Sequence, residues 1–285
     1  MIIDGKGDDS VASSLSKYKH PYVTVDLLLF SVIDDQLAIC LTMRDEEPFR
    51  DMYSLPGSFV RENESAEGAV ERLLSNKLGL QKQIYTEQLQ TFSDINRDPR
   101  ERVISIAYLG IIPDPEEVKV PWMKWFTICG SNVGSYKLCQ VQPLNVSDMT
   151  TENHVRNADY SQGAMSEQVQ SGSDDFVTEF ISTNLGFDHD KMLRIGVDRL
   201  KAKIDYTDII FKFLKDSGKF TAATLREIYQ AVTGQEINRG NFTKYQMNTY
   251  MEHGLIKKTG STSVGRGRPA DTYSYIGGEG LWIKY

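Results

Sequence analysis

Three residues with the chemistry of DNA recognition open a predicted helix near the C-terminus. Arg239, Asn241 and Lys244 stand within the stretch Arg-Gly-Asn-Phe-Thr-Lys-Tyr. Arginine and lysine pair with guanine and asparagine pairs with adenine, while all three can also hold phosphate. Taken alone, the pattern fits an ordinary solvated helix face equally well, so the flanking sequence decides between the two interpretations.

A basic turn follows this helix and favours DNA. Lys257 and Lys258 come first, and Gly265-Arg266-Gly267-Arg268-Pro269 comes next, so six Lys or Arg residues stand against one acidic residue, Glu252, between positions 239 and 268. The glycines allow close approach, and the arginines supply planar donors for the phosphate backbone or the minor groove. The predicted DNA-binding residues are Arg239, Asn241, Lys244, Lys257, Lys258, Arg266 and Arg268.

The elements around these residues predict a winged helix-turn-helix. Apolar spacing indicates a helix over 208–217, a second helix over 222–233 that Thr221 caps, and a third over 239–253. Two strands around the Gly/Arg turn complete the pattern. This order is typical of a small α+β DNA-binding domain, whose third helix enters the major groove.

A different motif lies near the N-terminus. Leu55-Pro56-Gly57-Ser58-Phe59-Val60 is followed by Glu64, Arg72, Leu74 and Gly79-Leu80. This segment resembles a Nudix box, whose pattern is Gly-x5-Glu-x7-Arg-Glu-U-x-Glu-Glu-x-Gly-U with U aliphatic, and the spacing between Glu64, Arg72 and Gly79 fits without a gap.

The resemblance also shows what has been lost. In active members, carboxylates on one helix face bind Mg²⁺, which neutralises a pyrophosphate during hydrolysis. This chain has Leu73, Asn76 and Lys77 at those positions, and Ser58 replaces the first glycine of the box. Because Glu64 alone cannot assemble a divalent-cation site, we expect no catalytic residue, no metal and no cofactor.

Further segments narrow the resemblance to the Nudix-related transcriptional regulators. It covers most of 20–128 and 185–275, and that family controls NAD or sugar metabolism. The segments that carry it are Met43-Arg44-Asp45-Glu46-Glu47-Pro48-Phe49, Thr91-Phe92-Ser93-Asp94, Arg97 to Val103, Trp125-Phe126 and Phe187-Asp188-His189.

The family resemblance implies a nucleotide-like effector, with ADP-ribose first and a related nucleotide or a sugar as alternatives. Arg44, Arg100 and Arg102 can bind phosphates, and Glu64 can accept from ribose hydroxyls. Surface arginines also commonly pair with neighbours such as Asp98. The predicted effector-binding residues are Arg44, Glu47, Phe49, Gly57, Ser58, Glu64, Arg100 and Arg102. We interpret His189, Trp125 and Phe126 as packing residues.

Length and charge indicate two domains. The chain has 285 residues and a net charge of −7, but 206–285 carries 11 Lys and Arg against 7 Asp and Glu, while the remainder carries 21 against 32. The basic tail suits nucleic acid. We predict an α/β Nudix-like mixed-sheet sandwich over 1–205, with a polar insertion over about 130–184, and a winged-helix domain over 206–285.

Within the first domain, alternating and apolar runs predict strands over 22–31, 37–42, 52–60, 89–94 and 102–112. Helical spacing predicts a helix that Ser65 caps and Gly79 ends, and a later helix over 188–204. A strand over 176–181 is a further expectation. The turns between strands include Asp34-Asp35-Gln36 and Asn96-Arg97-Asp98-Pro99.

The three cysteines, Cys40, Cys129 and Cys139, have no CxxC spacing, which argues against a disulfide framework and a zinc site. No apolar run approaches the roughly 18 to 20 residues that a membrane span needs. These observations favour a soluble cytoplasmic protein with reduced cysteines.

The first interpretation is a dimeric, ligand-responsive repressor of NAD or sugar metabolism genes, dimeric because paired half-sites supply affinity for DNA. An alternative is a Nudix hydrolase of the ADP-ribose pyrophosphatase type with an accessory DNA-binding domain, which uses Glu64 and carboxylates from elsewhere, such as Asp94. A third is an interaction scaffold whose wing binds protein or RNA.

Overall fold

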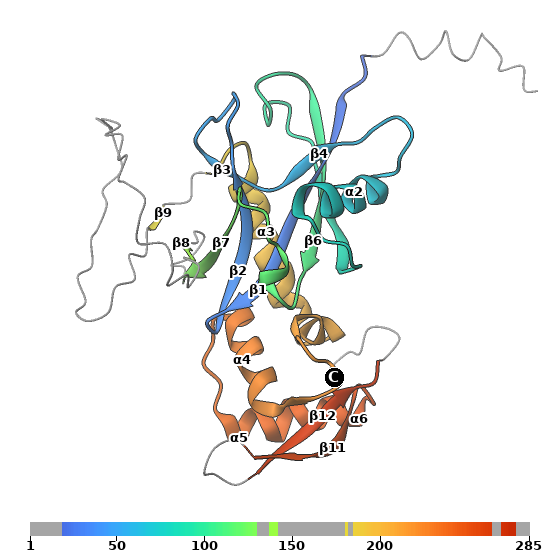
Figure 1. The fold of residues 1–285 in the computed structure, drawn as a ribbon, viewed down its shortest axis with the longest axis vertical. Helices are drawn as coiled ribbons and strands as arrows, with labels where there is room; N and C mark the ends of the chain where they lie inside the picture. Colours follow the sequence, from blue (N-terminus) through green and yellow to red (C-terminus); the bar gives the residue numbers. More distant parts are fainter. Residues whose placement is uncertain (1–18, 130–136, 142–179, 182–184, 264–268, 278–285) are drawn as a thin grey trace, which may run out of the picture.

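A computed structural model of the chain describes residues 19–129, 137–141, 180–181, 185–263 and 269–277. Residues 20–204 of this set form a nine-stranded mixed sheet with helices on its faces, and residues 208–275 form a three-stranded sheet with short helices (Figure 1). The arrangement is the α/β Nudix-like sandwich followed by a winged-helix domain that the sequence predicted.

The large sheet has the strand order β5-β6-β1-β2-β7-β8-β9, with β3 paired to β2 and β4 paired to β1. Strands β1 and β6 are parallel, and the other pairs are antiparallel. The strands are β1 Tyr22–Ile33, β2 Gln36–Met43, β3 Tyr53–Ser54, β4 Gly57–Phe59, β5 Tyr85–Phe92, β6 Val103–Ile111, β7 Met123–Cys129, β8 Lys137–Gln140 and β9 Phe180–Ile181.

Strand β1 is apolar on both faces because a helix covers each face of the sheet. Val25, Leu27 and Leu29 pack in the core beneath α2 (Ala66–Leu78). Leu28 and Phe30 pack in the core beneath α3 (His189–Lys203). A central strand buried on both faces has no polar face to alternate with, which explains the continuous apolar run.

Helix α2 confirms the predicted caps. The Ser65 side chain accepts a hydrogen bond from the backbone N–H of Gly68, and Gly79 adopts φ 71°, the left-handed conformation that ends many helices. Helix α3 begins one residue after the predicted start and ends at Lys203.

The winged-helix domain contains the 3₁₀ helix η2 (Asp208–Phe213), β10 (Phe220–Thr221), α4 (Ala222–Thr233), a helix over 239–252 labelled α5, η3 and α6, and the wing strands β11 (Ile256–Thr262) and β12 (Ala270–Tyr275). Segment η3 (Phe242–Met247) is π-helical, between α5 (Arg239–Asn241) and α6 (Asn248–Glu252). The core of the winged-helix domain, which includes Phe211, Phe242 and Tyr250, is continuous with the core on the α3 side of the large sheet.

The predicted helix over 208–217 is wrong in type and length. Thr207 caps a 3₁₀ helix that ends at Phe213, and Leu214 is extended. The Asp216 side chain then accepts from the N–H groups of Gly218 and Lys219. This local turn satisfies backbone donors outside a helix, so it competes with helix continuation.

Cys129 of β7 and Cys139 of β8 form a disulfide between neighbouring strands, in contrast to the reduced pair that the sequence suggested. Strand pairing brings the two residues together across ten positions of sequence. Cys40 is free and buried, and this burial raises the pKa of its thiol to about 12. No helix in the described part of the chain is both long and apolar enough to cross a bilayer.

Candidate functional site

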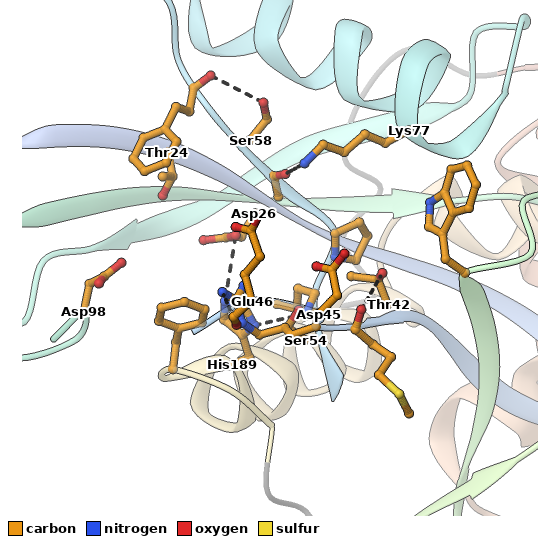
Figure 2. Close-up of a pocket in the computed structure, with 18 of the residues that line it drawn as sticks. Thr24, Asp26, Thr42, Asp45, Glu46, Ser54, Ser58, Lys77, Asp98 and His189 are labelled. Atoms are coloured by element: carbon orange, nitrogen blue, oxygen red, sulfur yellow. Dashed lines mark hydrogen bonds and ion pairs between the residues drawn. The ribbon is translucent and has the colours of Figure 1, made fainter. Parts of the chain in front are cut away.

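A polar cavity of about 950 Å³ opens at one end of the large sheet. Its walls come from β1, the end of β2, the loop around β3 and β4, helix α2, residues 97–100 and the start of α3. Figure 2 shows side chains from these elements, including Asp26, Glu46, Lys77 and His189, facing a shared space. The volume lies within the range of small-molecule sites.

A buried ion-pair cluster forms the floor of the cavity. Arg97 pairs with Asp188 at 2.9 Å and with Asp26 at 3.5 Å, and its side chain is 3% exposed. Asp26 also accepts a hydrogen bond from the Ser105 hydroxyl. This cluster joins the central strand β1 to the first residues of α3.

His189 is buried beside this cluster. Its Nδ1 accepts a hydrogen bond from the backbone N–H of Leu55 at 3.0 Å, so its Nε2 carries the proton of the neutral ring. That Nε2 lies 3.8 Å from a carboxylate oxygen of Asp26. Burial lowers the pKa of His189, and the nearby carboxylates only partly oppose this effect. The ring therefore ties α3 to the loop before β4, in the structural role that the sequence indicated.

The Nudix-like segment keeps a scaffold that depends on Glu64. Two nitrogens of Arg72 donate to its carboxylate, and the N–H of Arg61 donates to it as well. The hydrogen bond from Arg72 is the main reason that the pKa of Glu64 falls to about 2. Arg72 also donates to the Ser58 hydroxyl and to the Phe59 carbonyl. Glu64 thus holds the loop over 57–61 against α2.

The three positions without carboxylates take separate places in the structure. Leu73 is buried in the core beneath α2, and Asn76 is exposed. Lys77 lines the cavity, where its ammonium donates to the Gly57 carbonyl at 2.7 Å (Figure 2). Among the described residues, no three His, Cys, Asp or Glu side chains are placed to hold a metal ion.

The structure brings together four of the eight predicted effector-binding residues: Arg44, Gly57, Ser58 and Arg100 line the cavity. The other four, Glu47, Phe49, Glu64 and Arg102, do not line it. Glu64 is already bonded to Arg72, and Arg102 donates to the carbonyls of Asp94 and Ser93. Asp94, the carboxylate considered for hydrolysis, also lies outside the cavity lining.

Arg97, Phe187 and Lys77 line the cavity, although the sequence alone does not place them in the effector site. In the sequence Arg97 stands in a polar turn, Phe187 in a family motif, and Lys77 at the position of a lost carboxylate. Phe187 has φ 62° and its ring lies beneath the guanidinium carbons of Arg44 and Arg100, at 4.8 and 5.6 Å from its centroid. A lone aspartate, Asp26, within an apolar strand was the signal for a buried cationic partner.

The predicted recognition helix presents a polar surface over an apolar base. Asn238 caps its start by accepting from the N–H groups of Gly240 and Asn241. Phe242, Met247 and Tyr250 are buried, while Arg239, Asn241 and Lys244 are exposed. The three side chains are therefore free to reach the edges of bases in a groove.

The wing follows at once. Lys257 and Lys258 are exposed on β11, and Lys258 pairs with Asp271 of β12 at 2.7 Å. Arg266 and Arg268 lie outside the described residues.

Comparison with known proteins supports both parts of the fold. Residues 210–275 match the family model of the NrtR DNA-binding winged helix domain. Across 262 residues, 91% of this chain and 84% of the relative, the sequence is 24% identical to the ADPR responsive transcriptional repressor NtrR of Acinetobacter baylyi. Across 92 residues, 32% of this chain and 52% of the relative, it is 37% identical to the ADP-ribose pyrophosphatase of Methanocaldococcus jannaschii.

A solved structure extends the likeness to the whole fold. Shewanella oneidensis NrtR, crystallised with a 27mer DNA, superposes with a TM-score of 0.61 at 24% identity, covering 89% of this chain and 93% of that chain. The fold and the site thus define a Nudix-like sandwich with a large polar cavity, joined to a DNA-binding winged-helix domain. Residues 210–275 thus carry a winged-helix domain of the NrtR type, and the chain as a whole is similar in sequence and fold to NrtR regulators.

Proposed function

We propose that this protein is a transcriptional repressor of NAD or sugar metabolism genes that responds to ADP-ribose or a related nucleotide or sugar. One observation carries the proposal: the helix that starts at the floor of the cavity, α3, leads directly into the DNA-binding domain. The A. baylyi relative is named for a response to ADPR, which favours that effector. Selecting and sequencing the DNA fragments that the purified protein retains would test the proposal, because the retained sites name the regulated genes.

We further propose that the effector binds between Arg44, Arg100 and the loop at Gly57 and Ser58. Two copies of the chain then read paired half-sites in the cytoplasm. We place the boundary of the two domains near residue 205, between α3 and η2. Random fragments recovered without any shared sequence would contradict the regulatory function.

We expect no hydrolysis of ADP-ribose. Leu73 is part of the core, Asn76 is exposed and Lys77 carries a positive charge, so these positions bring no carboxylate to a metal. Incubation with ADP-ribose and Mg²⁺, followed by chromatography, should show no release of AMP. Turnover at ordinary catalytic rates that Glu64→Gln abolishes would support the hydrolase instead.

Asn241→Ala should reduce discrimination at one or two base pairs of the operator, at a cost of about 1–3 kcal/mol for the preferred base. Arg266→Ala should instead weaken binding to all duplexes alike and lower the slope of log affinity against log salt by about one per half-site. Fluorescence anisotropy with operator variants at several salt concentrations measures both effects. Lys219→Ala, an exposed cation outside the helix and wing, is the control. Wild-type behaviour of both variants would show that the helix and wing are wrongly assigned.

A further inference from the structure

Six lysine and arginine side chains line the cavity, and three of them are already paired with carboxylates. Arg72 pairs with Glu64, Arg97 pairs with Asp26 and Asp188, and Arg100 pairs with Asp98. Arg61 is exposed at the rim. Lys77 and Arg44 remain, and neither forms an ion pair with a carboxylate among the described residues.

Lys77 extends from the last turn of α2 to the cavity wall. Its ammonium donates to the Gly57 carbonyl at 2.7 Å, which fixes its position and leaves two of its three donors for other partners. Gly57 itself is pressed against β1, because a Cβ there would come within 2.2 Å of a carboxylate oxygen of Asp26. The carbonyl that holds Lys77 therefore has little freedom to move.

Arg44 is fixed in a similar way. Its guanidinium donates to the carbonyls of Pro48 and Glu46 at 2.7 and 3.3 Å, and it lies over the ring of Phe187. Loss of water and the neighbouring Arg100 lower the pKa of Arg44. Loss of water, Arg72 and Arg44 likewise lower the pKa of Lys77, with Asp26 in opposition. Both cations line the same cavity, and Arg44 contributes to the lowered pKa of Lys77, so an anion that contacted both side chains would be favourable.

We propose that Lys77 and Arg44 form a diphosphate seat, in which the ammonium of Lys77 supplies the positive charge that a divalent cation would otherwise bring. The proposal rests on the proposed function and deepens it, because it names the group of the effector that the cavity recognises and a residue that binds it. Effector binding at this seat requires no Mg²⁺. The lysine at position 77 thus removes a carboxylate that could bind a metal ion and supplies an ammonium group that binds the diphosphate directly.

The test is calorimetric titration of the full chain with ADP-ribose, inorganic pyrophosphate and adenosine, each in EDTA and in Mg²⁺. Wild-type protein should bind ADP-ribose with the same affinity in both buffers. Lys77→Met should lower the affinity for ADP-ribose by about 10- to 100-fold, the usual effect of losing a hydrogen bond to a charged group. Its affinity for adenosine, which has no phosphate, should not change, and Lys77→Arg should restore part of the loss.

Lys82→Met is the matched control, because Lys82 pairs with Glu117 and lies outside the cavity lining. Wild-type affinity in Lys77→Met, an equal loss for adenosine, or a need for Mg²⁺ in the wild type would overturn the seat, as would a wild type that binds neither phosphate compound. If pyrophosphate binds through Lys77 but ADP-ribose does not bind, the seat stands and ADP-ribose is the wrong effector. Thermal unfolding of each variant shows whether a loss of affinity reflects a loss of folding.

Discussion

Arg97→Met is expected to lower the free energy of unfolding by about 3–5 kcal/mol, the usual cost of removing one partner from a buried ion pair. Arg97 is almost fully buried between Asp26 and Asp188, so methionine fills much of its space but leaves both carboxylates without a cation. Urea titration followed by circular dichroism measures the change.

Lys82→Met removes an exposed ion pair and should cost about 1 kcal/mol or less. A loss in Arg97→Met no larger than in this control would show that the cluster contributes little to stability. The double variant Asp26→Asn, Arg97→Met should recover part of the loss, because one of the two uncompensated charges is then absent.

Saturating ADP-ribose is expected to change the affinity for operator DNA by about 5- to 150-fold, the ordinary range for coupling between two sites. Arg97 and His189 line the cavity and hold the start of α3, so a ligand bound there would press on the residues that position this helix. The chain after α3 continues through Asp205, whose carboxylate accepts a hydrogen bond from Tyr229 of α4 at 2.7 Å. By linkage, operator DNA must change the affinity for ADP-ribose by the same factor.

Tyr229→Phe removes this hydrogen bond and keeps the buried ring, so it should reduce the coupling while leaving each ligand able to bind. Anisotropy titrations of operator with and without ADP-ribose, and calorimetry with and without operator, measure both directions. If ADP-ribose, NAD and candidate sugars all leave the affinity for operator DNA unchanged, the first domain does not sense these compounds and serves only as a scaffold.

The sequence predicted elements that depend on neighbouring residues. Helix α2 carries its own caps at Ser65 and Gly79, and α4 follows the capping side chain of Thr221, so local pattern defines their bounds. Strand β7 was not predicted, because its pairing with β2 is a long-range contact that no local signal records.

The cavity was harder to predict for the same reason. Arg97 meets Asp26 and Asp188 across 71 and 91 positions of sequence, and without those partners it resembles a residue of a polar turn. Glu64 matched the family motif, but only the structure shows that its carboxylate is occupied by Arg72. Residue type indicated which side chains can bind phosphate, and pairing within the protein decides which of them are free to do so.

The continuous core between the large sheet and the DNA-binding domain has a mechanical consequence. Phe30 of β1, Leu200 of α3 and Phe242 of the predicted recognition helix belong to one packed cluster, and α4 lies against β2 at the end of the sheet (Figure 1). Close-packed interiors transmit displacement because they have low compressibility. The predicted recognition helix is therefore rigidly coupled to the sandwich domain. A small rotation of the sandwich would displace this helix, and the displacement would grow with the distance of the helix from the axis of rotation. In a dimer, rotation of the two chains in opposite directions would change the spacing between their recognition helices without unfolding any helix or strand.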